Sequence, residues 1–272
     1  MTRAPAAAKI NLALVVGPPR GDGKHELLTV FQRVGLVDRI ELDAGPGLEI
    51  EGFADDTLVR GALEALARAA DVEPRWRVRI EKAIPVAAGL GGGSSDAATA
   101  LRLANETLPE PLAQDALRAL AAALGSDVPF FLTDGPQLGS GDGTELEPLD
   151  LPQDFWVVLL LPDGATKPST GAVYAAFDER DGAAGFDERR RVLREALAAV
   201  RRPRDLAALP PNDLAASPLA AELLAAGAFR ADVSGAGPTL YGLFEERDHA
   251  RAAERSLRRL GRTWLTPPAW YG

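Results

Sequence analysis

The feature that most limits how this chain can fold is a glycine-rich loop that leads directly into an apolar helical pattern. Residues 85–98 read Pro-Val-Ala-Ala-Gly-Leu-Gly-Gly-Gly-Ser-Ser-Asp-Ala-Ala, with four glycines within positions 89–93. Glycine lacks Cβ and adopts positive φ angles readily, so successive backbone N–H groups can converge on an anion. The N-terminus of the next helix adds its partial positive charge at the same point. The pattern therefore predicts a phosphate-binding loop.

The two serines of the loop are expected to add hydroxyl donors and to cap the helix. The residues predicted to hold the phosphates are Pro85, Val86, Ala87, Ala88, Gly89, Leu90, Gly91, Gly92, Gly93, Ser94 and Ser95. No Lys-Ser or Lys-Thr pair follows the glycines, so this is not a Walker A loop, and Ser94 stands where a Rossmann fingerprint needs its third glycine. A glycine-rich turn without a ligand is the alternative.

A second glycine-rich segment, residues 139–143, reads Gly-Ser-Gly-Asp-Gly and also looks suited to phosphate. No helical pattern follows it, so no helix N-terminus would face a bound anion there. We predict a hairpin turn at this segment.

Composition excludes several classes of protein. The net charge of −9 argues against nonspecific binding to nucleic acid, whose phosphates need a basic surface. The chain has no cysteine, which excludes disulfides, thiolate metal sites and cysteine nucleophiles. Its two histidines, His25 and His249, are too few for a multi-histidine metal site, so no metal-ligating residue is assigned.

The chain is also expected to be cytoplasmic and free of membrane contacts. No run of 18 or more apolar residues is present, and residues 1–8 lack the apolar core of a signal peptide. The sequence carries no signal for an oligomeric state.

Hydrophobic periodicity predicts an α+β protein whose strands gather early rather than alternating strictly with helices. Strands are expected at 10–16, 27–37, 39–42, 76–80, 155–161, 229–233, 239–244 and 263–266. Helices are expected at 57–70, 95–108, 112–124, 191–200, 219–226 and 249–260, the first of them capped by Asp55 or Asp56. The polar stretch 163–190 gives few clear signals.

Three segments, in this order, resemble the conserved motifs of the GHMP kinase superfamily, which includes galactokinase, homoserine kinase and mevalonate kinase. They are residues 8–12 (Ala-Lys-Ile-Asn-Leu), the loop at 85–98, and residues 233–239 (Val-Ser-Gly-Ala-Gly-Pro-Thr). The triple glycine before the two serines resembles the diphosphocytidyl-methylerythritol kinases in particular. Residues 22–27, 125–130 and 212–214 extend the resemblance over almost the whole chain.

This resemblance implies a two-domain fold and a phosphotransferase. Residues 1–152 would form an N-terminal ATP-binding and catalytic domain like the second domain of ribosomal protein S5, and residues 153–272 a ferredoxin-like domain. The implied reaction moves the γ-phosphoryl group of ATP to the 2-hydroxyl of a cytidine-diphosphate-linked methylerythritol, in the non-mevalonate route to isoprenoid precursors. Two alternatives stay open: another GHMP kinase of the homoserine or mevalonate type, and a sensor of the same fold without catalysis.

The resemblance also assigns the catalytic residues. Asp127 matches the position of the family's catalytic aspartate, which would accept a hydrogen bond from the acceptor hydroxyl and take its proton. Lys9 matches its partner, implying an ion pair that keeps Asp127 ionised and stabilises charge on the acceptor oxygen. The residues alone favour a capping or turn aspartate at Asp127 and leave open a solvent-reaching strand-edge lysine at Lys9, and it is the resemblance that reverses the interpretation of Asp127. Asn11 lies on the same strand face as Lys9 and is expected to bind the acceptor.

His25 matches the part of the family that binds cytosine. The preceding position, commonly tyrosine in the family, holds Lys24, so another residue must supply the stacking surface. Tyr174 and Phe177 lie in the segment where the family has a second aromatic residue. The expected cofactors are ATP and Mg²⁺, the ion bound largely by phosphate oxygens and water, and the expected partners are small molecules.

Overall fold

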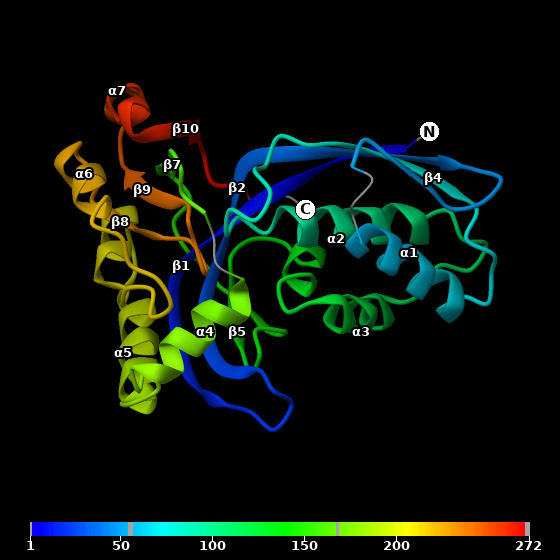
Figure 1. Cartoon of the computed structure of the whole chain (residues 1–272), viewed down its shortest axis with the longest axis horizontal. Helices are drawn as coiled ribbons and strands as arrows, with labels where there is room; N and C mark the ends of the chain where they lie inside the picture. The colour runs from blue at the N-terminus through cyan, green and yellow to red at the C-terminus, as the bar shows by residue number, and fades with distance from the viewer. Residues whose placement is uncertain (1, 54–56, 167–168, 270–272) are drawn as a thin grey trace.

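The computed structural model describes residues 2–53, 57–166 and 169–269. They form two β-sheets with helices packed against each, which confirms the predicted α+β class. Figure 1 shows helices α1, α2 and α3 side by side against the first sheet, and α5, α6 and α7 with the second sheet at the other end of the molecule. No described helix is both long and apolar enough to cross a membrane.

The first sheet is built on one long hairpin. Strand β1 spans Thr2–Pro19, and β2, spanning His25–Ala44, pairs with it along nearly its whole length. The prediction of separate strands at 27–37 and 39–42 was wrong, since β2 runs through without a break. Asp38 does not end the strand because its buried carboxylate accepts hydrogen bonds from the backbone N–H groups of Ala83 and Ile84.

The remaining strands of this sheet are β3 (Glu49–Glu51), β4 (Trp76–Glu81), β5 (Gln137–Ser140) and β6 (Glu145–Pro148). The path is β3-β4-β2-β5-β6, and β1 pairs with β2 off this path. β4 alternates buried and exposed residues, as its sequence predicted. β5 and β6 form an antiparallel hairpin whose turn holds residues 141–144, which confirms the turn predicted for residues 139–143.

Three helices cover the first sheet: α1 (Thr57–Ala69), α2 (Gly92–Asn105) and α3 (Gln114–Leu124). The predicted cap of α1, Asp55 or Asp56, lies outside the described residues. Helix α2 begins three residues earlier than predicted, and its N-cap is Gly91 in the left-handed conformation. The two serines therefore lie inside the first turn, and the prediction that they cap the helix was wrong.

The second sheet has the order β10-β7-β9-β8. Its strands are β7 (Trp156–Pro162), β8 (Arg230–Val233), β9 (Leu240–Phe244) and β10 (Gly261–Thr266). Its helices are α4 (Thr170–Glu179), α5 (Phe186–Ala199), α6 (Ala220–Ala225) and α7 (Arg247–Leu257). Short 3₁₀ turns lie at Pro129–Leu132, Pro203–Ala208 and Arg258–Leu260.

Helix α4 and the start of α5 occupy the polar stretch 163–190, for which no helix was predicted. Phe177 is the buried residue of α4, so an apolar period is almost absent from its sequence. The helix nevertheless has a local start signal, because the Ser169 hydroxyl accepts a hydrogen bond from the N–H of Ala172.

The two sheets share one core and are also joined by the end of the chain. Apolar residues of β1 and β2 pack in one cluster with residues of β7, β9 and α5. After β10 the chain returns to β2, where the N–H of Ala269 donates to the carbonyl of Arg33 and that of Gly35 to the carbonyl of Pro267. The strands of the first sheet end at Pro148 and those of the second begin at Trp156, while the exact boundary at 152/153 stays a prediction.

Candidate active site

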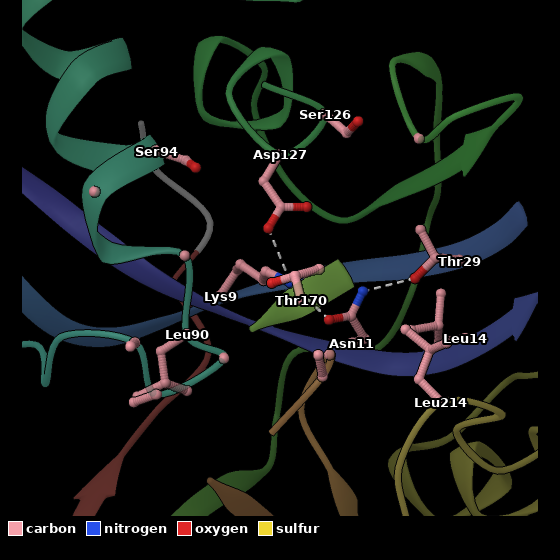
Figure 2. Close-up of a pocket in the computed structure, with 18 of the residues that line it drawn as sticks. Lys9, Asn11, Leu14, Thr29, Leu90, Ser94, Ser126, Asp127, Thr170 and Leu214 are labelled. Atoms are coloured by element: carbon pink, nitrogen blue, oxygen red, sulfur yellow. Dashed lines mark hydrogen bonds and ion pairs between the residues drawn. The ribbon is translucent and has the colours of Figure 1, made fainter. Parts of the chain in front are cut away.

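A cavity of about 910 Å³ opens where the two halves of the chain meet. Its wall comes from β1, the glycine-rich loop, the segment before the first 3₁₀ turn, the β5–β6 turn, helix α4 and the loop after β8. Figure 2 shows Asp127 pointing toward Lys9, with Asn11 and Thr29 beside them. Of the residues assigned from the sequence, all except Ser95 line this cavity.

Lys9 and Asp127 meet in the cavity as an ion pair, as the resemblance implied. The Lys9 Nζ lies 3.2 Å from Asp127 Oδ2, and the lysine side chain is 5% exposed while that of Asp127 is 36% exposed. A nearly buried ammonium is tolerated only with compensating partners. Here they are the carboxylate, the face of the Phe31 ring at 5.4 Å and the amide oxygen of Asn11 at 2.7 Å. The charged end of Lys9 is therefore fixed beside the exposed oxygens of Asp127.

Asn11 continues this contact into the sheet. Its Oδ1 accepts from Lys9, and its Nδ2 donates to the hydroxyl of Thr29 at 2.7 Å, which donates in turn to the carbonyl of Ala13 at 2.8 Å. The dashed lines of Figure 2 trace the first part of this chain. Because both ends of the amide have partners, its orientation is fixed, and Asn11 holds Lys9 in place in addition to its predicted contact with an acceptor.

The glycines of the loop are required mainly for packing against the protein itself. Gly89 has φ +81°, and a Cβ there would lie 2.4 Å from the carbonyl oxygen of Ser234. Gly91 has φ +68°, and its Cβ would lie 2.9 Å from Cγ of Lys9. Added Cβ atoms at Gly92 and Gly93 would also meet side chains rather than open space. The expected reason for these glycines was thus incomplete, because Gly89 also brings the backbone against the segment 233–239 and Gly91 brings it against β1.

That close packing directs the start of α2 toward the cavity. The N–H groups of the first helical turn have no acceptor within the helix and can bind an anion. Gly92, Gly93 and Ser94 supply these groups and line the cavity. The loop is held from both sides, because the N–H of Lys9 donates to the carbonyl of Leu90 and the Ser234 hydroxyl to that of Gly89.

A buried cluster of three charged residues, Lys82, Asp38 and Asp96, lies beside the loop. It was not predicted from the sequence. The Lys82 Nζ lies 2.5 Å from Asp38 Oδ2 and 2.6 Å from Asp96 Oδ2, and both carboxylates are fully buried. Burial alone would lower the pKa of Lys82, but the two acids outweigh it and raise that pKa. Lys82 lines the cavity beside the loop, so it presents a permanent positive charge there.

Asp96 makes this cluster sensitive to pH. Burial, and next the charge of Asp38, raise the pKa of Asp96 to about 7 although Lys82 opposes the shift. The folded chain therefore retains a proton that the unfolded chain releases above its usual pKa of about 4. The contribution of Asp96 to stability is present at low pH and is lost as pH rises through the window between these two values.

Replacing Asp96 by asparagine should remove this pH dependence. We expect the free energy of unfolding of the variant to fall less between about pH 5 and about pH 8 than that of the parent protein. Urea denaturation at both pH values measures the difference. Asp115→Asn is the matched control, because the Asp115 side chain is 96% exposed. An unchanged pH profile in Asp96→Asn would contradict the raised pKa.

His25 lies at the other end of the cavity, where it begins β2 and contacts helix α4. Its Nε2 donates to Asp178 Oδ1 at 2.8 Å, and its ring lies 4.7 Å from that of Tyr174 and 6.0 Å from that of Phe177. Burial, with a smaller contribution from the charge of Asp127, raises the pKa of Tyr174 to about 12. Tyr174 lines the cavity, whereas Phe177 is buried behind it.

Lys24, next to His25, forms an ion pair with Asp142 in the β5–β6 turn. The segment predicted to be a plain turn therefore contributes to the cavity wall. Asp142 and Gly143 both line the cavity, and the missed signal was the aspartate between the glycines. Lys82, Thr170 and Asp178 were also missed. Each is a single polar residue outside any motif, and only the fold brings it to the cavity.

Among the described residues, no group of three or more histidine, aspartate or glutamate side chains is arranged to hold a metal ion. The groups suited to a cofactor are instead anion-binding ones: the first turn of α2 and the Lys82 ammonium.

Comparison with known proteins gives one consistent family. The sequence model described as "GHMP kinases N terminal domain" matches residues 57–135, and "GHMP kinases C terminal" matches residues 212–263. The chain is 39% identical over 278 residues to the 4-diphosphocytidyl-2-C-methyl-D-erythritol kinase of Geobacter sulfurreducens, covering 96% of this chain and 95% of that protein.

Solved structures agree. A crystal structure of 4-(cytidine 5'-diphospho)-2C-methyl-D-erythritol kinase superposes with a TM-score of 0.80 at 34% identity, covering 98% of this chain and 99% of the other. A mevalonate kinase structure superposes with a TM-score of 0.76 at 13% identity, covering 98% of this chain and 99% of the other, which supports the fold alone. The expected GHMP kinase fold is thereby confirmed. The chain belongs to the GHMP kinase family, in the branch formed by the 4-diphosphocytidyl-2-C-methyl-D-erythritol kinases.

Proposed function

We propose that this protein transfers the γ-phosphoryl group of ATP to the 2-hydroxyl of 4-diphosphocytidyl-2-C-methyl-D-erythritol, in the non-mevalonate route of isoprenoid precursor biosynthesis. The observation that carries the proposal is the Lys9–Asp127 pair, 3.2 Å apart in the same cavity into which the first turn of α2 opens. A phosphate site and an acceptor-activating carboxylate then face one another. The relatives at 39% and 34% identity supply the identity of the acceptor.

In this proposal Asp127 and Lys9 act on the acceptor hydroxyl. The hydroxyl donates a hydrogen bond to Asp127, and its oxygen attacks the γ-phosphorus while the bond from that phosphorus to the β,γ-bridging oxygen breaks. Asp127 takes the hydroxyl proton, and ADP leaves with the electron pair of the broken bond. The Lys9 ammonium, fixed by Asn11 at 2.7 Å, stabilises the negative charge that develops on the acceptor oxygen.

The glycine-rich loop and Lys82 would bind the nucleotide. The N–H groups of the first turn of α2 suit the phosphates, and the Lys82 ammonium adds charge beside them. We propose that Mg²⁺ arrives with ATP and is held largely by phosphate oxygens and water. The donor set fits this, since the described residues offer no cluster of carboxylates and histidines to hold the ion alone.

His25 would read the cytosine base. Because its Nε2–H is donated to Asp178, a neutral imidazole presents Nδ1 as an acceptor. The exocyclic amine of cytosine can donate to this atom, whereas uracil offers a carbonyl oxygen at the same place. Tyr174, with its neutral phenol, is the aromatic surface beside it that we propose in place of the tyrosine absent at Lys24.

We therefore predict that cytidine diphosphate competes with the acceptor and that uridine diphosphate competes at least about tenfold more weakly, the scale for leaving one buried polar group unpaired. Inhibition constants of both nucleotides against the acceptor measure this. His25→Gln should reduce the discrimination. Equal inhibition by the two nucleotides would remove the base-reading role of His25.

An acceptor panel separates the proposal from its alternatives. ADP release would be followed with the cytidine-linked methylerythritol, homoserine and mevalonate as acceptors. We expect rapid release with the first alone. Turnover with another acceptor would indicate a different GHMP kinase, and no acceptor-dependent turnover would indicate a sensor. We further propose that the protein acts in the cytoplasm with these small molecules as its partners.

A further inference from the structure

The acceptor of the proposed reaction carries a diphosphate, and its negative charge needs a positive partner in the cavity. The lysine and arginine residues that line the cavity, among those the structure describes, are Lys9, Lys24 and Lys82. Identifying which of them faces the acceptor diphosphate depends on how each ammonium is already engaged.

Two of these lysines, Lys9 and Lys82, already have partners that hold their ammonium groups in place. Lys9 is 5% exposed, paired with Asp127 and bonded to Asn11, so its charge serves the reacting hydroxyl. Lys82 is 16% exposed and lies between two fully buried carboxylates beside the glycine-rich loop. Moving the Lys82 ammonium would leave two buried carboxylates without compensation, at a large cost in free energy, and moving that of Lys9 would break its contacts with both Asp127 and Asn11.

Lys24 differs from both. Its side chain is 46% exposed and has one acidic partner, Asp142. Its backbone is fixed, because its N–H donates to Asp22 and its carbonyl accepts from the N–H of Arg20. A long, exposed side chain on a fixed backbone can move its ammonium by rotating about its own bonds.

Lys24 also lies at the right place along the cavity. It is next to His25, where the base is proposed to bind. Asp142 is next to Gly143, at which an added Cβ would lie 3.8 Å from Cβ of Ser126, the residue before Asp127. The ion pair thus lies between the base end and the catalytic end, where a diphosphate that links base to reacting hydroxyl must pass.

Asp142 is built to receive the lysine without depending on it. Its Oδ1 accepts from the hydroxyl of Thr144 at 2.6 Å, which leaves Oδ2 for Lys24. Partial burial would raise the pKa of Asp142, but the hydrogen bonds from Lys24 and Thr144 outweigh it and hold the pKa at about 2. The hydrogen bond from Thr144 does not involve the lysine, so it holds the carboxylate in place when the ammonium moves away.

We propose that Lys24 is the diphosphate-binding residue of the acceptor site, and that Asp142 holds its ammonium until the acceptor arrives. The inference rests on the proposed function. Binding of the diphosphate exchanges the carboxylate partner of Lys24 for phosphate oxygens. Asp142 thus competes with the acceptor and sets the affinity, while the glycine-rich loop and Lys9 are unaffected.

The test measures the affinities of cytidine and cytidine diphosphate by calorimetry, in the parent protein and in two variants. Lys24→Met keeps the length of the side chain and removes the charge. It should therefore lower the affinity for cytidine diphosphate by about tenfold or more, as expected for a lost charge-assisted hydrogen bond. Cytidine, which has no phosphate, should change by less than about twofold. Asp142→Asn can still accept a hydrogen bond from Thr144. It should raise the affinity for cytidine diphosphate because it releases the Lys24 ammonium.

Arg204→Met is the matched control, since it removes one positive charge at a residue that does not line the cavity. It should leave both affinities unchanged. The proposal is overturned if Lys24→Met changes the affinity for neither ligand. It is also overturned if the variant lowers the affinity for cytidine as much as that for cytidine diphosphate, because Lys24 would then contact the base. Weaker binding of cytidine diphosphate by Asp142→Asn would refute the claim that Asp142 competes with the diphosphate for Lys24. It would indicate instead that the ion pair is a fixed part of the cavity wall.

Two further results separate this inference from the function on which it rests. In the full reaction, Lys24→Met should raise KM for the acceptor while kcat changes little, whereas a merely structural role would not alter the ratio of the two affinities. If the parent protein binds no cytidine diphosphate at all, the proposed function fails. If it binds the nucleotide and Lys24→Met binds it equally well, the inference alone fails.

Discussion

Asp127→Asn should lower turnover by at least ~10²-fold, the usual scale for losing a positioned general base. The substitution keeps the size of the side chain but removes both the charge and the proton acceptor. The side chain is 36% exposed, so the variant should fold normally. The affinity for ATP should change little, because the loop is held independently by the contacts of Leu90 and Gly89.

The measurement is steady-state ADP release with saturating acceptor, together with ATP binding by calorimetry. Asp163→Asn serves as a control for loss of a carboxylate, since Asp163 is exposed and does not line the cavity. Near-normal turnover in Asp127→Asn would refute the catalytic role of the carboxylate. A parallel loss of ATP affinity would mean that Asp127 acts through the nucleotide site.

Lys9→Met should reduce turnover on the same scale of at least ~10²-fold, typical for removing one preorganised stabiliser of transition-state charge. Methionine is close to lysine in length but lacks the ammonium that lies over the Phe31 ring. The variant also leaves Asp127 without its cation and Asn11 without the ammonium that its oxygen accepts. Circular dichroism and retained ATP binding would establish that the loss does not come from misfolding.

The double variant tests whether the two residues act as one unit. Their atoms are 3.2 Å apart, so their effects should not add. We expect Lys9→Met/Asp127→Asn to be scarcely slower than the slower single variant. Multiplicative losses would leave both residues important but refute the coupling between them.

Local patterns in the sequence predicted the elements whose signal lies within a few residues. The alternating residues of β4 and the glycine-rich loop before α2 are examples. The full length of β1 and β2 was missed because Lys9 and Asp38 look like interruptions, and only tertiary partners make them acceptable inside a strand. Helix α4 was missed because burial of Phe177 alone leaves no period to detect.

The same distinction applies to the candidate site. Lys9, Asn11 and the loop belong to motifs and were assigned from the sequence. The partners that set their environment come from distant segments: Lys82 bridges residues 38 and 96, and His25 pairs with Asp178. Lys24 and Asp142 are 118 positions apart in the chain, and a search for local motifs cannot join them.

The position of the new phosphate group tests the central claim most directly. The protein would be incubated with ATP and 4-diphosphocytidyl-2-C-methyl-D-erythritol, and the products followed by phosphorus NMR with a parallel count of ADP. We predict one ADP for each new phosphomonoester, with the ester on the 2-hydroxyl and no ADP formed without the acceptor. ADP formed at the same rate without the acceptor, or a phosphate attached at another position, would contradict the account.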